Sequence, residues 1–349
     1  MIKDKEGHEV HLMGEANGHK LIYGNSGQGK TFFLMRELES YCEQGKTILI
    51  LDYSGSFTEK EMVEKKFLYP DKVKRFNLDE EESFQWTFCA DSIELCIKNV
   101  ADALGEVLNC GSYYQKKLLE EAVRRTVESG NGLCISRLLR IVEEMLLERQ
   151  INENAGRTVE NLQHLLTRLF PYEDIDNFVI RNQEAQIDTD DVLTILDISC
   201  YPEGQRRFLT KFIVSLLWRE AYRPKAKSRY EILALDEMQF LSVKEGSTLN
   251  SMLHEGRKKG LSLLLSTQYI SHYGEDEKSA LHQADTKIIF RPTPEDRRYS
   301  ARVIAPMNPR IWERELEGLK KGEALLKGHY RLDNRNRILD TPLIIKAFP

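Results

Sequence analysis

Short apolar runs alternate with longer segments of helical periodicity along much of the chain. This alternation is typical of a mostly parallel sheet whose strands are connected by helices. The runs predicted as strands are Lys20–Tyr23, Thr47–Leu51, Val192–Asp197, Glu231–Leu235, Leu261–Leu265, Thr286–Phe290 and Glu323–Leu326. Before them, the segment Lys3–Met13 is predicted to form a hairpin.

Residues 83–186 follow a different pattern. Apolar residues recur there at helical spacing within Leu118–Val127, Leu138–Leu146 and Leu162–Leu169, and no strong strand pattern is present. A crossover between parallel strands needs only about a dozen residues. We therefore expect an α/β fold with an all-helical insertion. The predicted division is 1–82 for the hairpin and first part of the core, 83–186 for the insertion, and 187–349 for the rest of the core.

One loop matches the phosphate-binding pattern G-x-x-x-x-G-K-[ST], with the residues Gly24, Asn25, Ser26, Gly27, Gln28, Gly29, Lys30 and Thr31. The glycines let successive N–H groups point at phosphate oxygens. Lys30 places a positive charge on the β- and γ-phosphates, and the Thr31 hydroxyl binds Mg²⁺. A predicted strand precedes the loop and a predicted helix follows it, as the motif requires. The sequence thus predicts a P-loop NTPase.

A P-loop needs a second magnesium-binding carboxylate at the end of a nearby strand. Asp236 follows the apolar run Ile232–Leu235 and meets that need, while Glu237 is suited to activate water as a general base. The alternative is that both carboxylates cap a following helix. The guanine-reading N-K-x-D pattern is absent, which favours ATP over GTP as the nucleotide.

The strand Leu261–Leu265 follows Glu255–Gly260, which contains Arg257, and leads into Ser266, Thr267 and Gln268. This combination resembles the HerA/FtsK superfamily of hexameric motor ATPases, which includes conjugation coupling proteins and type IV secretion ATPases. Asp52 after the second strand, the end of the third strand at Asp197–Ser199, and the strand Lys287–Phe290 followed by Asp296 also fit.

The resemblance implies a RecA-like core that assembles into a hexameric ring. It implies that Arg257 acts in a neighbouring subunit's site, the alternative being a cation at a helix end. It also implies that Gln268 is a sensor, and that Asp52 is an accessory acid unless it is a turn carboxylate. Many relatives carry a basic residue and then an acidic one in the turn after the second strand. The turn Asp52–Ser56 lacks that acidic residue after Asp52. An N-terminal β-barrel and membrane helices, present in some relatives, are not expected here.

Composition narrows the possible partners. The net charge is −5, so no global basic field indicates nucleic-acid binding. No signal peptide or membrane span is predicted, and six scattered cysteines indicate free thiols, so a cytoplasmic protein is expected. We expect an ATP- and Mg²⁺-dependent ring motor that moves DNA with a protein partner such as a nuclease. The alternatives are a protein-secretion or assembly ATPase and a nucleotide-dependent regulator of an effector.

Overall fold

The structure is a computed structural model that describes residues 2–13, 18–78, 84–87, 92–130, 132–151, 156–181, 192–222, 228–335 and 337–347. Residue contacts divide the chain into two compact units. Unit 1 comprises Met1–Arg75, Asp190–Leu196 and Ser228–Pro349. Unit 2 comprises Phe76–Thr189 and Asp197–Lys227.

A ten-stranded sheet has the strand order β1-β14-β12-β11-β3-β10-β9-β4-β8-β5. Its strands are β1 (Lys3–Asp4), β3 (Lys20–Tyr23), β4 (Ile48–Asp52), β5 (Val73–Asn77), β8 (Leu193–Asp197), β9 (Ile232–Leu235), β10 (Ser262–Thr267), β11 (Thr286–Phe290), β12 (Glu323–Lys327) and β14 (Leu343–Lys346). The central strands β11, β3, β10, β9 and β4 run parallel. At one side of the sheet, the strands β12, β14 and β1 are antiparallel to their neighbours.

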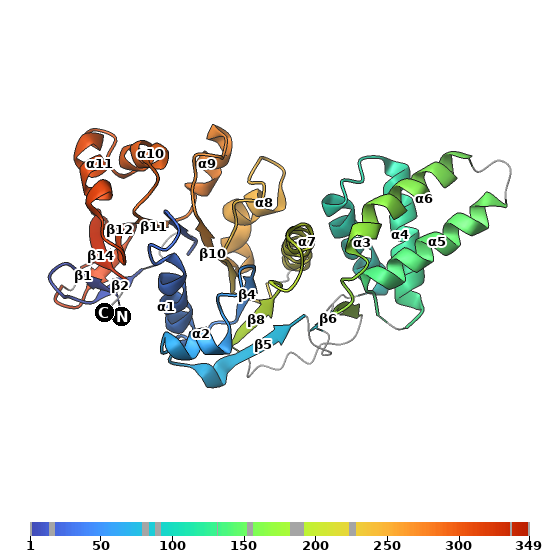
Figure 1. Cartoon of the computed structure of the whole chain (residues 1–349), viewed down its shortest axis with the longest axis horizontal. Coiled ribbons are helices and arrows are strands. Elements are labelled where there is room, and N and C mark those ends of the chain that lie inside the picture. Colours follow the sequence, from blue (N-terminus) through green and yellow to red (C-terminus); the bar gives the residue numbers. More distant parts are fainter. Residues whose placement is uncertain are drawn as a thin grey trace. The chain divides into compact units, whose positions relative to one another are not determined.

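Unit 1 also contains helices and a small second sheet (Figure 1). The helices are α1 (Lys30–Glu43), α2 (Glu59–Glu64), α8 (Thr248–Glu255), α9 (Glu275–Leu281), α10 (Pro294–Ile304) and α11 (Pro309–Gly318), with the 3₁₀ turns η1 (Pro70–Lys72) and η3 (Gly256–Lys259). The small sheet pairs β2 (Val10–Leu12) with β13 (Tyr330–Leu332).

The burial of the core strands explains why the sequence predicts them. Every residue of β3, β4, β9 and β11 is buried, and so is all of β10 except Ser262. Parallel strands covered on both faces form continuous apolar runs. The predicted strands are confirmed within two residues at each end, and the predicted α/β class with a mostly parallel sheet is confirmed.

Unit 2 holds most of the predicted insertion. Its helices are α3 (Ile93–Val107), α4 (Tyr113–Glu128), α5 (Ile135–Gln150), α6 (Gly156–Leu169) and α7 (Glu203–Ala221), with the 3₁₀ turn η2 (Phe170–Tyr172). It is not entirely helical, because β6 (Phe84–Thr87) pairs in parallel with β7 (Phe178–Arg181). These four-residue strands are too short to show a period. Unit 2 also takes in α7, which the predicted three-part division places in the core.

Three smaller expectations have mixed outcomes. The chain reverses between Ile2 and Val10 through a 2.9 Å backbone hydrogen bond, but β1 joins the large sheet and β2 joins β13 rather than forming a simple hairpin. Five described cysteines are free thiols, whereas Cys89 lies outside the described residues. None of the described helices is both long and apolar enough to cross a membrane.

A buried ion pair ties α1 to β3. Lys20 Nζ donates a hydrogen bond to Glu37 Oε2, and the two side chains are only 8% and 4% exposed. The Tyr41 ring centroid lies 4.7 Å from Lys20 Nζ. Burial alone would lower the pKa of Lys20, but the charge of Glu37 and the contact with Tyr41 raise it above its usual value. Lys20 is therefore charged in the interior, where it depends on Glu37.

The substitution Glu37→Ala leaves Lys20 buried without its counter-charge. We expect it to reduce the free energy of unfolding by about 3–5 kcal/mol. The double substitution Lys20→Met with Glu37→Leu removes both charges and should recover most of that loss. Urea unfolding of the two variants measures the difference, and equal losses in both would contradict this account.

Candidate nucleotide-binding site

The loop Gly24–Gly29 connects the end of β3 to the first turn of α1. Gly24 has φ 142°, and a Cβ there would lie 2.7 Å from the carbonyl oxygen of Phe290. Gly29 precedes α1 with φ 118°, a value that also favours glycine. Lys30 Nζ donates to the carbonyl oxygens of Gly24 at 2.7 Å and Asn25 at 3.0 Å. The loop therefore already curls around the lysine.

Two backbone contacts hold this loop from its sides. The Asn25 amide donates to the Arg291 carbonyl oxygen at 3.0 Å, just after β11. The Gln28 carbonyl oxygen accepts from the Gly322 amide at 2.9 Å, just before β12. Burial lowers the pKa of Lys30, although the charges of Glu237 and Asp236 oppose that shift. The loop thus has a fixed shape and a partly buried cation facing two carboxylates.

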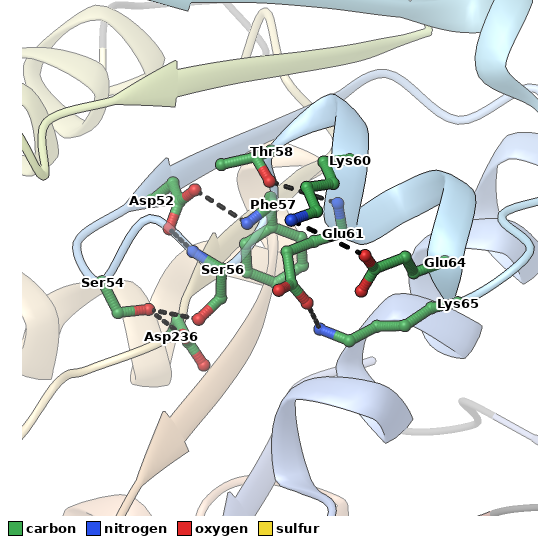
Figure 2. A network of polar contacts seen from close by, with 10 residues as sticks. All are labelled: Asp52, Ser54, Ser56, Phe57, Thr58, Lys60, Glu61, Glu64, Lys65 and Asp236. Atoms are coloured by element: carbon green, nitrogen blue, oxygen red, sulfur yellow. Dashed lines mark hydrogen bonds and ion pairs between the residues drawn. The ribbon is translucent and has the colours of Figure 1, made fainter.

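Asp236 follows β9 and is 4% exposed. Its Oδ2 accepts a 2.9 Å hydrogen bond from Ser54 Oγ, which comes from the turn after β4 (Figure 2). Burial, the charge of Glu237 and that of Asp52 raise the pKa of Asp236 to about 7, although Ser54 and Lys30 lower it. A carboxylate so placed would be stabilised by a divalent cation.

Glu237 is held by two side-chain amides. Gln268 Nε2, at the end of β10, donates to Glu237 Oε1 at 3.3 Å, and Gln239 Nε2 donates to Glu237 Oε2. Gln239 Oε1 in turn lies 3.4 Å from Thr267 Oγ1. These contacts connect the carboxyl ends of β9 and β10, so the structure brings together Glu237 and Gln268, two residues that were singled out separately in the sequence.

Sequence analysis missed two members of this group, Ser54 and Gln239. Ser54 lies two residues beyond the carboxyl end of β4 and Gln239 lies four residues beyond that of β9, and each comes two residues after a residue already singled out. The available signal was a polar side chain just past the end of a predicted core strand.

Asp52 has the geometry of a turn carboxylate. It is fully buried, and its two oxygens accept hydrogen bonds from the amides of Ser56 at 3.0 Å and Phe57 at 2.9 Å (Figure 2). These bonds close the turn that presents Ser54 to Asp236. The alternative of a turn carboxylate therefore fits Asp52, and its charge contributes to the raised pKa of Asp236.

The structure does not bring Arg257 to these residues. Arg257 is exposed in η3, which precedes β10, and β10 runs parallel to β3. The phosphate loop follows the carboxyl end of β3, whereas Arg257 precedes the amino end of β10. Arg257 therefore lies at the other end of these parallel strands. A six-residue strand spans about 20 Å. Arg257 would therefore have to act on a different subunit's site.

Thr31 and Asp236 are the residues suited to hold Mg²⁺ beside a triphosphate. They combine a hydroxyl at the start of α1 with a carboxylate at the end of β9, and oxygen ligands of this kind suit that ion. Another group, Asp4, Glu6 and His8, also places potential ligand atoms close together. There Asp4 Oδ1 accepts from the amides of Glu6 and His8, so this cluster is explained as a stabilised turn.

Comparisons with known proteins give one family and several solved structures. The family described as the central domain of helicase HerA matches residues 9–217, more than half of the chain. VirB4 of Thermoanaerobacter pseudethanolicus is similar in structure, with a TM-score of 0.63 and 15% identity over 100% of this chain and 95% of that one. No curated protein matches in sequence.

The bacterial conjugative coupling protein TrwB is also similar, with a TM-score of 0.65 and 15% identity over 94% of this chain and 86% of that one. A TrwB structure in complex with ADP and Mg²⁺ has a TM-score of 0.61 and 14% identity, over 94% of this chain and 85% of that one. At these identities the likeness shows the fold, and it confirms the predicted RecA-like class.

The raised pKa of Asp236 predicts a pH-dependent stability. Its pKa is about 7 in the folded protein and about 3.8 in the unfolded chain, so the folded state binds more protons between these values. Stability contributed by this group therefore falls as pH rises from about 4 to 7. Asp236→Asn removes the titration and should be more stable than wild type at pH 8 by roughly 2–4 kcal/mol.

Chemical unfolding without nucleotide at pH 4 and pH 8 measures this effect. The two proteins should be equally stable at pH 4, where Asp236 is protonated. Ser54→Ala, which removes a hydrogen bond to the charged carboxylate, serves as a matched control and should lower stability at pH 8 only. A pH-independent difference between wild type and Asp236→Asn would contradict the raised pKa.

Proposed function

The chain belongs to the family of the central domain of helicase HerA, and from this premise we propose that it is an ATPase that binds ATP with Mg²⁺ and drives a ring-shaped motor acting on DNA. The observation that carries the proposal is the meeting of Lys30, Asp236, Glu237 and Gln268 at one edge of the sheet. Solved TrwB complexes with an ATP analogue and with ADP and Mg²⁺ support the choice of ligands.

Each residue has a role that follows from its position. The amides of Gly24–Gly29 and the charge of Lys30 bind the phosphates, while the Thr31 hydroxyl and the Asp236 carboxylate ligate Mg²⁺. The cation neutralises charge on the triphosphate. Bound Mg²⁺ would stabilise the ionised form of Asp236, whose pKa is about 7 without the cation.

Glu237 is the proposed general base. It accepts a proton as water attacks the γ-phosphorus, and the bond to the β-phosphate oxygen breaks to give ADP and phosphate. Gln239 keeps one carboxylate oxygen in place. Gln268 contacts the other oxygen at 3.3 Å and can turn to the γ-phosphate instead. This exchange would free one oxygen of Glu237 for water when ATP is present.

A ring explains the position of Arg257. An exposed arginine at the sheet edge opposite its own phosphate loop can reach a phosphate only in a neighbouring subunit. There it would stabilise charge that develops on the γ-phosphate. We further propose a cytoplasmic homohexamer that works with a protein partner such as a nuclease. The net charge of −5 favours a protein-moving ATPase as the second candidate.

Wild-type protein should hydrolyse ATP with Mg²⁺, and double-stranded DNA should stimulate turnover more strongly at low salt than at high salt. Glu237→Gln should reduce kcat by about 10²–10⁴-fold, because it removes the base while leaving the binding groups in place. Phosphate-release assays at two salt concentrations measure this, with mass determined in the same buffers. Turnover that DNA leaves unchanged would contradict the DNA assignment and leave a protein substrate as the candidate.

The position of Arg257 predicts complementation between subunits. Arg257→Ala and Lys30→Ala should each abolish hydrolysis, but mixed rings should regain part of the activity. In such rings, Lys30 of one subunit faces Arg257 of a neighbour. Lys258→Ala is the matched control and should retain activity, since it alters an adjacent exposed cation. Mixtures that stay inactive while forming hexamers would argue against a role in trans.

A further inference from the structure

Two adjacent tyrosines begin helix α4 and face solvent. Tyr113 is 66% exposed and Tyr114 is 56% exposed. Their ring centroids lie 6.0 Å apart with planes at 76°, so the rings present differently oriented faces. The buried residues of α4, such as Leu118 and Leu119, provide its packing. The exposed rings are therefore not needed to hold the helix in unit 2.

A cation lies against each of these rings. Lys117 Nζ is 5.0 Å from the Tyr113 ring centroid, and the Arg157 guanidinium carbon on α6 is 5.1 Å from the Tyr114 centroid. Both cations are exposed. Within the part of the chain that the structure describes, neither of them forms an ion pair with a carboxylate. Their charges remain available to an anion.

Two acidic residues in the middle of the same helix already have partners. Glu120 lies 3.7 Å from Arg124, and Glu121 lies 2.8 Å from Arg125. Arg124 also pairs with Glu94 and Arg125 with Glu148, so both arginines are shared between carboxylates. The cations of this surface that remain for an anion are Lys117, Arg157 and the exposed Lys116.

A cavity lies between α4 and α6 beside the rings. It has a volume of about 450 Å³, within the range of small-molecule sites. Its lining comprises Tyr114, the cations Lys117, Arg124 and Arg157, the carboxylates Glu120 and Glu121, and Leu118, Thr158 and Asn161. An aromatic ring, three cations and two hydrogen-bonding groups thus surround a space large enough for a nucleotide, and the two carboxylates of the lining are paired with Arg124 and Arg125.

We propose that this aromatic–basic surface, made of Tyr113, Tyr114, Lys116, Lys117 and Arg157, binds single-stranded nucleic acid. Bases stack on exposed aromatic rings without regard to sequence, and neighbouring cations contact the phosphates. An acidic peptide would contact the cations but would not account for the exposed tyrosine rings. The inference rests on the proposed DNA substrate and adds a binding surface on unit 2, separate from the nucleotide site.

The test measures binding of a fluorescein-labelled oligothymidylate to the full-length protein by anisotropy. The double variant Tyr113→Ala/Tyr114→Ala should bind about tenfold more weakly or worse, because it removes both stacking platforms. Tyr113→Phe/Tyr114→Phe keeps the ring faces and should bind like wild type. Phe170→Ala, which removes another exposed ring of unit 2, is the matched control and should have no effect.

Salt dependence separates the cations from the rings. Lys117→Ala/Arg157→Ala should weaken binding and flatten the dependence of affinity on salt, whereas the tyrosine variant should keep the wild-type slope. Wild-type affinity in the double alanine variant would overturn the inference. Competition by polyglutamate as effective as that by unlabelled oligonucleotide would also overturn it and favour an acidic protein partner.

DNA-stimulated ATP hydrolysis, measured on the same proteins, distinguishes a failure of the binding surface from a failure of the proposed DNA substrate. If DNA stimulates wild type and the double alanine variant binds the oligonucleotide normally, only the surface is wrong. If wild type neither binds nor responds to DNA, the proposed substrate fails and this inference fails with it.

Discussion

The parallel pairing of β3, β10 and β9 is the constraint on which the site depends. In the sheet register, Tyr23 lies opposite Thr267 and Leu265 lies opposite Leu235. Because the strands run in one direction, their carboxyl ends share an edge. The phosphate loop, the Asp236–Glu237 pair and Gln268 are far apart in the chain, yet each begins where one of these strands ends. A reversed strand would place its polar end at the other edge.

The second feature is the charge balance of the nucleotide-binding site. Lys30 and Asp236 are both buried, and the pKa of each is shifted toward its neutral form. Hydrogen bonds nevertheless hold both side chains in place, because Lys30 donates to a carbonyl oxygen of the loop and Asp236 accepts from Ser54. The fold therefore maintains charged groups that a triphosphate and a divalent cation would stabilise. Such preorganisation costs folding stability and favours ligand binding.

The sequence was sufficient where burial or a motif leaves a strong local signal. The core strands are continuous apolar runs, and the phosphate loop has a fixed residue pattern. The sequence was insufficient where contacts between short segments determine the structure. The strands β6 and β7 have four residues each, and the strand β14, which pairs with β12 and β1, lies beyond the predicted runs. Ser54 and Gln239 join the site through the conformations of the loops after β4 and β9, and the contact of Arg157 with the Tyr114 ring depends on how α4 and α6 pack.

The central claim is that one edge of the sheet binds and positions Mg²⁺-ATP. A structure of the Glu237→Gln protein with ATP and Mg²⁺ tests it most directly. The account predicts the γ-phosphate between Lys30 and Gln268, with the cation bound to Thr31 and Asp236. It also predicts that the Gln268 amide has left residue 237 for the phosphate. A nucleotide bound elsewhere, or a cation that contacts neither Thr31 nor Asp236, would contradict the account.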